Sequence, residues 1–121
     1  MTQISNPFTT SEHFEGKDPV VRRIYDQLLR VLKQLGPVHE EPKKTSIHLV
    51  NATALAGVAT RKTCLILTIK SDHKLSSPRV HKTEQVSRNR FHNEIRLSSP
   101  EDLDAELVGW LRQAYALSAA P

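Results

Sequence analysis

The chain has 121 residues, a formal net charge of +4 and a sequence pI near 9.5. This length predicts one domain with one hydrophobic core, and the single cysteine, Cys64, excludes an internal disulfide. The longest uncharged stretch, residues 45–60, is shorter than the roughly 20 apolar residues that a membrane helix needs. Residues 1–17 also lack the basic stretch followed by an apolar stretch that marks a secretory signal peptide. We therefore expect a cytoplasmic protein that does not enter a membrane.

The apolar residues among the first seventeen show no helical or strand periodicity, whereas the residues after them carry clear signals of a helix. We expect a mobile lead-in over residues 1–17, with Phe8 or Phe14 held at the surface, and a single domain over residues 18–118. Asp18 followed by Pro19 is typical of a helix start, and Gly36 followed by proline is typical of a helix end. Between them the apolar residues recur at helical spacing, at Ile24, Leu28, Val31 and Leu35.

After residue 37 the apolar period changes from 3.6 to 2, which indicates a passage from helix to sheet. Strands are predicted over residues 46–50, 54–58, 64–69, 80–86 and 91–97, with 64–69 central and 80–86 at an edge. Ser99-Pro100-Glu101-Asp102 then predicts the start of a final helix. Its buried stripe is expected at Leu103, Leu107, Leu111 and Ala114, joined by Trp110 and Leu117.

These elements predict an α+β fold in two layers: an N-terminal helix, a four- to five-stranded, mostly antiparallel sheet and a C-terminal helix. Both helices should cover one face of the sheet, which leaves the other face in water. On strand 91–97, Phe91, Asn93, Ile95 and Leu97 are expected to face the core. The residues expected on the wet face are Lys44, Ser46, His48, His92, Glu94 and Arg96.

Two histidines on that face allow an enzymatic hypothesis. His48 and His92 could divide acid and base roles in a small hydrolase or phosphate-handling enzyme, because imidazole titrates near neutrality, with Lys44 and Arg96 as electrostatic support. This requires the two imidazoles to lie within about one hydrogen-bonded water of each other. The competing interpretation is that a solvated sheet face simply carries polar side chains.

The positive charge is concentrated in the middle of the chain, where residues 61–90 hold eight basic and two acidic groups. Basic side chains near nucleic acid gain affinity by releasing counterions, so our leading prediction is a non-enzymatic binding module for an anionic partner such as nucleic acid. Asn89 and Asn93 add amides that could read a base, although a turn at Arg88-Asn89 explains the first. The predicted binding residues are Lys44, Arg61, Lys62, Arg79, Lys82, Arg88, Arg90, His92 and Arg96. Lys70 and Lys74 belong to the same basic segment.

Other kinds of site find little support in the sequence. His73, His81 and His92 do not have a recognised metal-ligand spacing, and we predict neither a metal nor a cofactor. A third hypothesis is a protein–protein interaction subunit that pairs through a sheet edge or through a helix patch around Trp110 and Tyr115. Whether the chain is a monomer or a homodimer is left open.

The segments LGPVHEEPKKTSIHL, AGVATRKTCLILTIKSDH and SPRVHKTEQVSRNRFHNEIRLSSPEDLDAELVGWLRQAY carry a family resemblance. From Val20 to about Leu117 the chain resembles the bacterial family called domain of unknown function 5655, in its single-domain form. The resemblance implies a compact α+β domain, and it implies no reaction and no catalytic residue. More distantly, the layout is similar to small helix-flanked sheets of the YjbR/CyaY type, for which DNA or partner binding is suggested.

Overall fold

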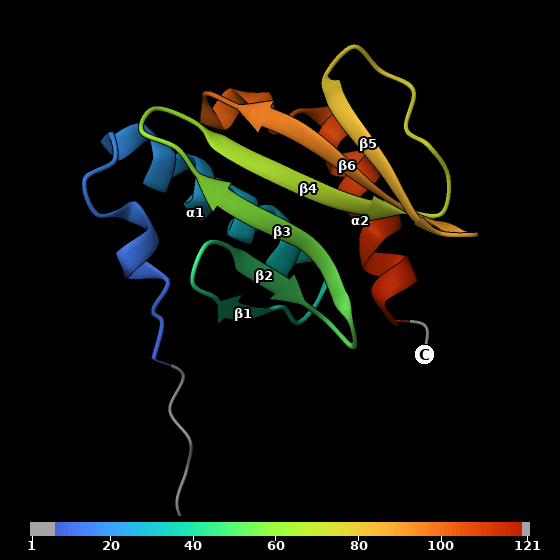
Figure 1. The fold of residues 1–121 in the computed structure, drawn as a ribbon, viewed down its shortest axis with the longest axis horizontal. Helices are drawn as coiled ribbons and strands as arrows, with labels where there is room; N and C mark the ends of the chain where they lie inside the picture. The colour runs from blue at the N-terminus through green and yellow to red at the C-terminus, as the bar shows by residue number, and fades with distance from the viewer. Residues whose placement is uncertain (1–6, 120–121) are drawn as a thin grey trace, which may run out of the picture.

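The computed structural model describes residues 7–119 and shows an α+β domain of two layers. In chain order the elements are η1 (Ser11–Phe14), α1 (Pro19–Leu35), β1 (His39–Pro42), β2 (Ile47–Val50), β3 (Ala54–Thr60), β4 (Leu65–Ser71), β5 (Val80–Ser87), β6 (Arg90–Leu97), η2 (Pro100–Asp102) and α2 (Ala105–Ala119). Both α-helices lie behind one face of the sheet (Figure 1). The predicted α+β class, with one helix before and one after the sheet, is confirmed.

The N-terminal segment is tied to the domain through its short 3-10 helix, η1. The Phe14 ring lies 5.1 Å from the Tyr25 ring, measured between centroids. His13 Nε2 lies 2.7 Å from the carbonyl of Lys43, and the Thr60 hydroxyl donates to the carbonyl of His13 at 2.6 Å. These contacts hold residues 13–14 against α1, the β1–β2 turn and the end of β3. Residues 1–6 of the expected lead-in lie outside the described residues, and its mobility stays a prediction.

Helix α1 begins and ends where the sequence predicts. The Asp18 carboxylate accepts from the amide of Val20 at 2.9 Å, which satisfies one of the free N–H groups of the first turn. The helix ends at Leu35, and Gly36 follows with φ +153°. Its core side carries Val21, Ile24, Tyr25, Leu28, Val31 and Leu32, all buried.

The sheet has six strands in the order β1-β2-β3-β4-β6-β5, and every neighbouring pair is antiparallel. β4, the most apolar segment, pairs with β3 and β6 and is central, as predicted. β5 is the edge strand, also as predicted. A register shift in β2 after Leu49 leaves Leu55 unmatched in β3, so Leu55 and Ala56 are both buried on the helix side.

The strand missing from the prediction is β1, which forms the other edge of the sheet. Its sequence, His-Glu-Glu-Pro, has no apolar alternation because three of its four residues are exposed. The strand exists because its backbone completes the hydrogen bonding of β2, and its proline is tolerated at an edge.

The predicted start of the C-terminal helix is wrong by one turn. Ser99 and Asp102 form a capping box, but around the 3-10 turn η2 and not around α2. Leu103 then departs from helical geometry, with ψ at 65°. The carboxylate of Asp104 accepts from the amide of Leu107 at 3.1 Å, and α2 begins at Ala105. One segment therefore contains two successive start signals, and the second one caps the long helix.

The core fills the space between the sheet and the two helices. Leu103, Leu107, Leu111 and Ala114 are buried, as predicted for the final helix. Trp110 and Tyr115, the residues of the predicted interaction patch, are half-buried and pack against this core. Within residues 7–119, no helix is long and apolar enough to cross a membrane.

Candidate anion-binding face

The face of the sheet that the helices do not cover is called the open face here. Its side chains follow from strand alternation and from the register of the pairs, and His48, Lys70, His92, Glu94 and Arg96 all lie on it. None of the five is buried. The prediction that the sheet turns its apolar side to the helices and its imidazoles to the solvent is confirmed. By the register, the open face includes Glu41, His48, Gly57, Ala59, Ile66, Thr68, Lys70, Lys82, Glu84, His92, Glu94 and Arg96.

A pocket of about 240 Å³ is hollowed into the middle of this face. Gly57 contributes no side chain to the floor, and a Cβ built on it would meet no atom within 4 Å. Polar side chains from β2, β4 and β6 surround the floor. The lining residues are Ser46, His48, Ala54, Ala56, Gly57, Val58, Ala59, Thr68, Lys70 and His92.

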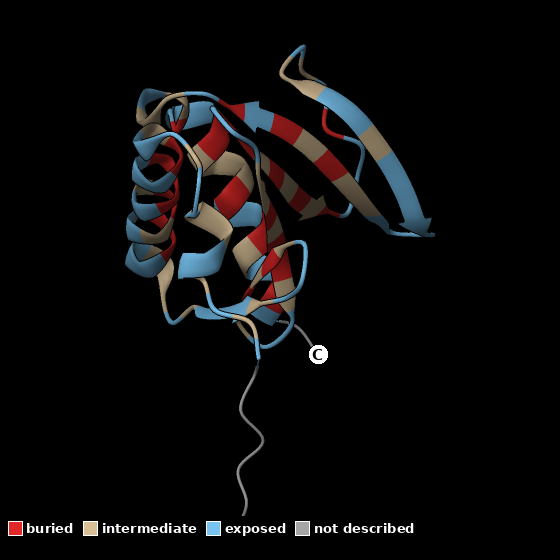
Figure 2. Ribbon diagram, turned by 60° about the vertical axis from the view of Figure 1, so that its left-hand side comes forward, coloured by how far each residue is buried: buried red, intermediate tan, exposed pale blue. Residues whose placement is uncertain are grey.

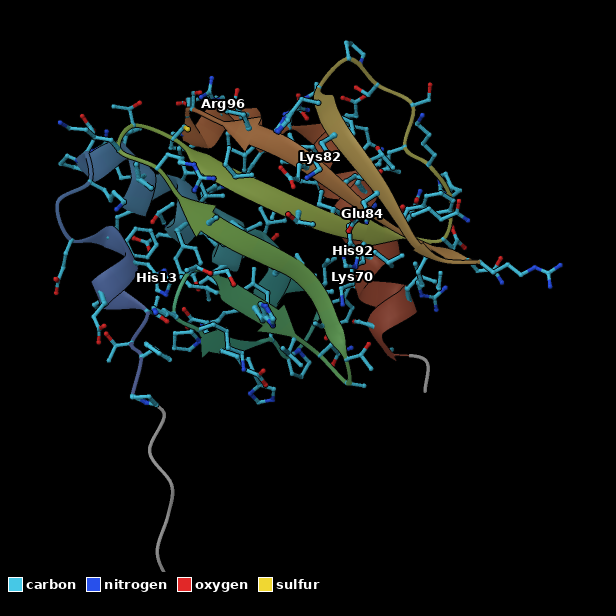
Figure 3. The ribbon with its side chains drawn as sticks, viewed as in Figure 1. His13, Lys70, Lys82, Glu84, His92 and Arg96 are labelled. Carbon is cyan, nitrogen blue, oxygen red and sulfur yellow. The ribbon has the colours of Figure 1, made fainter. Side chains whose placement is uncertain are left out.

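Three charged or titratable residues cross the sheet in one row beside the pocket. Lys70 of β4 is opposite His92 of β6, and His92 is opposite Glu84 of β5. Figure 3 shows their side chains close together on the open face. Burial, and then the positive charge of Lys70, lowers the pKa of the His92 imidazole below its ordinary value, and Glu84 acts in the opposite direction. His92 is therefore a neutral imidazole beside a cation at neutral pH.

His48 and His92 line the same pocket from opposite sides. Two strands, β3 and β4, lie between β2 and β6, and the register places His48 in the row of Thr68 and Glu94, two residues from the row of His92. At the usual strand spacing and rise, the two Cα atoms are therefore about 16 Å apart. This separation suits two contacts to one bound ligand better than direct proton transfer between the rings. The hydrolase hypothesis stays a prediction.

The predicted basic residues are divided among several places. Arg61 and Lys62 lie in the β3–β4 turn, whereas Arg88 and Arg90 lie at the turn of the β5–β6 hairpin. The length of β4, about 20 Å, separates these two ends. Lys44 lies in the β1–β2 turn, away from both.

Two of the predicted binding residues, Arg79 and Lys82, form ion pairs with carboxylates in the described part of the chain. Arg79 donates to the carboxylate of Asp104 at 2.7 Å, to that of Glu106 at 3.4 Å and to the carbonyl of Asp102 at 2.6 Å. It thus fastens the start of β5 to the start of α2. Lys82 Nζ lies 3.9 Å from the carboxylate of Glu94, an exposed pair that contributes little stability.

Arg96 is exposed at the other end of β6 and lines a separate hollow of about 460 Å³ together with Ile66, Arg79, His81 and Asp102.

Asn93 does not offer its amide to a ligand, because it is fully buried on the helix side of the sheet. Its Nδ2 donates to the carbonyl of Ile69 at 3.0 Å and to the hydroxyl of Ser71 at 2.9 Å. Its Oδ1 accepts from the amide of Leu75 at 3.4 Å and from the hydroxyl of Thr83 at 3.2 Å. Asn93 therefore joins β4, the β4–β5 loop and β5, and the idea that it reads a base is wrong. Asn89 lies in the predicted hairpin turn.

The outer end of the β5–β6 hairpin is the most exposed part of the sheet. Residues 84–90 are all exposed, in contrast to β3 and β4. Figure 2 shows β5 as an almost continuous exposed band away from the helices. We call residues 85–90 the ribbon tip. It carries Gln85, Val86, Ser87, Arg88, Asn89 and Arg90.

Among the residues that line the pocket, sequence reasoning did not select Gly57 and Thr68, and it named Lys70 only as part of the basic segment. Thr68 and Lys70 are two and four residues after Ile66 on β4, so strand alternation alone places all three on one face. Strand order, which the sequence does not reveal, is needed to place them beside His48 and His92. Among the described residues 7–119, no group of three or more His, Cys, Asp or Glu is arranged to hold a metal ion.

Comparison with known proteins identifies the family. Residues 10–118 match the model of a family described as Domain of unknown function (DUF5655), which covers nearly the whole chain. The chain therefore belongs to this family. Neither a curated protein nor a solved structure matches it.

Proposed function

We propose that this DUF5655 domain is a small binding module for an anionic partner, and that the partner is a nucleic acid held at the ribbon tip. The observation that carries the proposal is the pair Arg88 and Arg90 at the outermost turn of a two-stranded ribbon. Both are exposed, and neither forms an ion pair with any residue in the described part of the chain. Besides the hydrogen bond with His73, the guanidinium charge of Arg90 lowers the pKa of the nearby Asp72 carboxyl, but Asp72 does not form an ion pair with Arg90. Exposed guanidinium groups that no carboxylate binds directly favour phosphate contact.

The shape of the ribbon supports the same class of partner. A two-stranded ribbon fits the major groove of duplex DNA, which is roughly 12 Å wide. The amides of Gln85 and Asn89 lie on the same tip as the two arginines. The tip could therefore contact phosphates with its arginines and base edges with its amides.

The open face itself is less suited to carry a long polyanion. Glu94 lies opposite Thr68, Glu84 lies opposite His92, and Glu41 lies opposite His48. A phosphate backbone laid across the row of Thr68 or the row of Lys70 would therefore meet repulsion from a carboxylate. The tip has no acidic residue between positions 85 and 90, and it is the favoured contact.

The test is a salt series of binding by fluorescence anisotropy, with labelled duplex and single-stranded DNA and RNA. We expect Arg88→Ala with Arg90→Ala to weaken binding and to make the slope of log affinity against log salt shallower by up to about 2, one unit for each lost phosphate contact. The matched control is Arg61→Ala with Lys62→Ala, which removes the same charge at the opposite end of β4 and should leave the slope unchanged. Absence of binding at low salt, or equal effects of the two double variants, would refute the proposal.

A further inference from the structure

The pocket beside the ribbon contains hydrogen-bonding groups that the fold does not use. Thr68, Lys70, His48 and His92 make no side-chain hydrogen bond or ion pair to another residue within 7–119. All four line the same pocket of about 240 Å³ and come from three strands. Together they offer an ammonium group, a hydroxyl and two imidazoles.

We infer that this pocket binds a terminal phosphomonoester, and that it receives the phosphorylated end of a nucleic-acid strand whose neighbouring part is held at the ribbon tip. The inference rests on the proposed function, which supplies the strand. A phosphomonoester carries about −1.5 to −2 charges on three terminal oxygens and so needs several donors around one point. Lys70 supplies the charge, and Thr68 and the imidazoles supply directed donors.

A second hollow connects this pocket with the ribbon tip. It has a volume of about 290 Å³, and it shares Lys70, His92 and Ala54 with the first pocket. Its further lining includes Arg90, Val86 and Ser87 at the tip, and Ala114, Leu117 and Ser118 on α2. A strand that contacts Arg90 can therefore place its end beside Lys70 and His92 without crossing the sheet.

The acidic residues around the pocket favour binding of the end of a nucleic-acid strand over binding of a strand that continues through the pocket. Glu41 stands beyond His48 on β1, Glu94 beyond Thr68 on β6 and Glu84 beyond His92 on β5. A strand that continued through the pocket would carry its next phosphates toward one of these carboxylates. A strand that stops at the pocket avoids them.

The floor of the pocket leaves room for the sugar or base next to the phosphate. Glycine in a strand often marks a place where a ligand approaches the backbone closely, and open space lies above Gly57. Ala54 and Ala59 are the other short side chains of β3 there. Together they form a shallow apolar surface between His48 and Lys70.

Binding of a dianion should change the protonation of His92. The charged groups around its ring are Lys70 on β4, Glu84 on β5, and Arg90 and Glu94 on β6, with His48 across the pocket. The neutral ring in the free protein would take up a proton as the phosphate enters, because the added negative charge raises its pKa. Affinity should therefore rise as the pH falls from about 8 toward about 6, where the phosphate itself begins to lose charge.

The experiment compares one single-stranded oligonucleotide with a 5′-phosphate, with a 3′-phosphate and with hydroxyl groups at both ends, and it compares adenosine 5′-monophosphate with adenosine. The readout is the ratio of affinities for the phosphorylated and the hydroxyl form within each variant. We expect one phosphorylated strand to bind at least about tenfold more tightly in the wild-type protein. Gly57→Val, whose Cβ would meet no atom within 4 Å and whose methyl groups would occupy the floor, and Lys70→Ala should each bring the ratio near one. Lys33→Ala, at an exposed position of α1 behind the other face of the sheet, should leave it unchanged.

Titration calorimetry near pH 6.5 in two buffers of different ionisation enthalpy adds an independent readout. We expect proton uptake with the phosphorylated strand and a smaller uptake in His92→Gln. Equal affinity for phosphorylated and hydroxyl strands, together with a persisting effect of the Arg88 and Arg90 changes, would overturn the inference and leave the proposed function standing. Binding of the monophosphate that depends on Lys70, without binding of any strand, would establish the phosphate site and refute the proposed function.

Discussion

The buried amide of Asn93 makes four hydrogen bonds that join β4, the β4–β5 loop and β5, and its removal should be costly. Asn93→Ala leaves the amide of Leu75 without an acceptor inside the core and takes one donor each from the carbonyl of Ile69 and the hydroxyl of Ser71. All three residues are buried, with exposed fractions of 0, 3 and 4% for Ile69, Ser71 and Leu75. Thr83 is only half-buried, so water can replace its bond.

An orphaned buried donor costs about 1–3 kcal/mol, and each lost internal bond adds about 1 kcal/mol. We therefore expect Asn93→Ala to lower the free energy of unfolding by about 3 kcal/mol, a large share of the roughly 5–15 kcal/mol typical of a domain. The control Thr83→Val removes one bond of the same network and should cost about 1 kcal/mol or less. Urea unfolding measures both values.

Asn93→Asp gives a sharper check of the same network, because it places an acceptor where Nδ2 faces the carbonyl of Ile69. Burial would raise the pKa of this new carboxyl above its unfolded value of about 3.9. The folded state then binds the proton more tightly, so the deficit in stability should be largest above the folded pKa and should shrink as the pH falls through it. Losses below about 1 kcal/mol for Asn93→Ala, or a deficit in Asn93→Asp that does not vary with pH, would refute the assigned network.

Three further substitutions test the contacts that hold the fold around the candidate site. Tyr25→Phe removes a 2.6 Å bond from its hydroxyl to a carboxylate on β1 and should cost about 1.5–3 kcal/mol in urea unfolding. Burial raises the pKa of Tyr25, so the wild-type protein should lose stability as the pH rises above about 10, and this loss should be smaller in the variant. Arg79→Lys should lower the melting temperature and leave the salt dependence of binding unchanged, because its guanidinium contacts Asp104 and not a partner; a shallower salt slope would count against this role. Gly36→Ala should destabilise more than Gly16→Ala, because both have positive φ but only the first would press a Cβ against the Tyr115 hydroxyl; equal melting temperatures would contradict this.

The strands that sequence patterning found are those with one buried face. Residues 46–50 and 91–97 alternate because every second side chain enters the core, and β4 is apolar because it lies between two neighbours. β1 escaped detection because its pairing involves only the backbone at an edge. The first residue of α2 was misplaced because two capping signals, Ser99 and Asp104, follow each other within five residues, and only tertiary packing decides which one begins the long helix.

The sequence predicts which residues of each strand lie on the open face. It does not predict which residues of different strands lie next to one another there. Alternation places His48 and His92 outside, whereas the strand order brings them to one pocket through β3 and β4. The role of Arg79 depends on carboxylates 25 and 27 residues later in the chain, so no local pattern distinguishes it from Arg88. Asn93 lies on the core-facing side of its strand, as the alternation predicts. Its four hydrogen bonds explain why a polar residue is tolerated in this buried position.

The proposal that the β5–β6 ribbon and the adjoining pocket receive a nucleic acid is tested most directly by amide chemical shifts. Isotope-labelled protein would be titrated with a 5′-phosphorylated oligonucleotide and followed by two-dimensional NMR. We expect the largest shifts at residues 85–90, at Thr68, Lys70 and His92, and little change at Arg61 and Lys62. Shifts confined to α1, α2 or the β3–β4 turn would contradict the proposal.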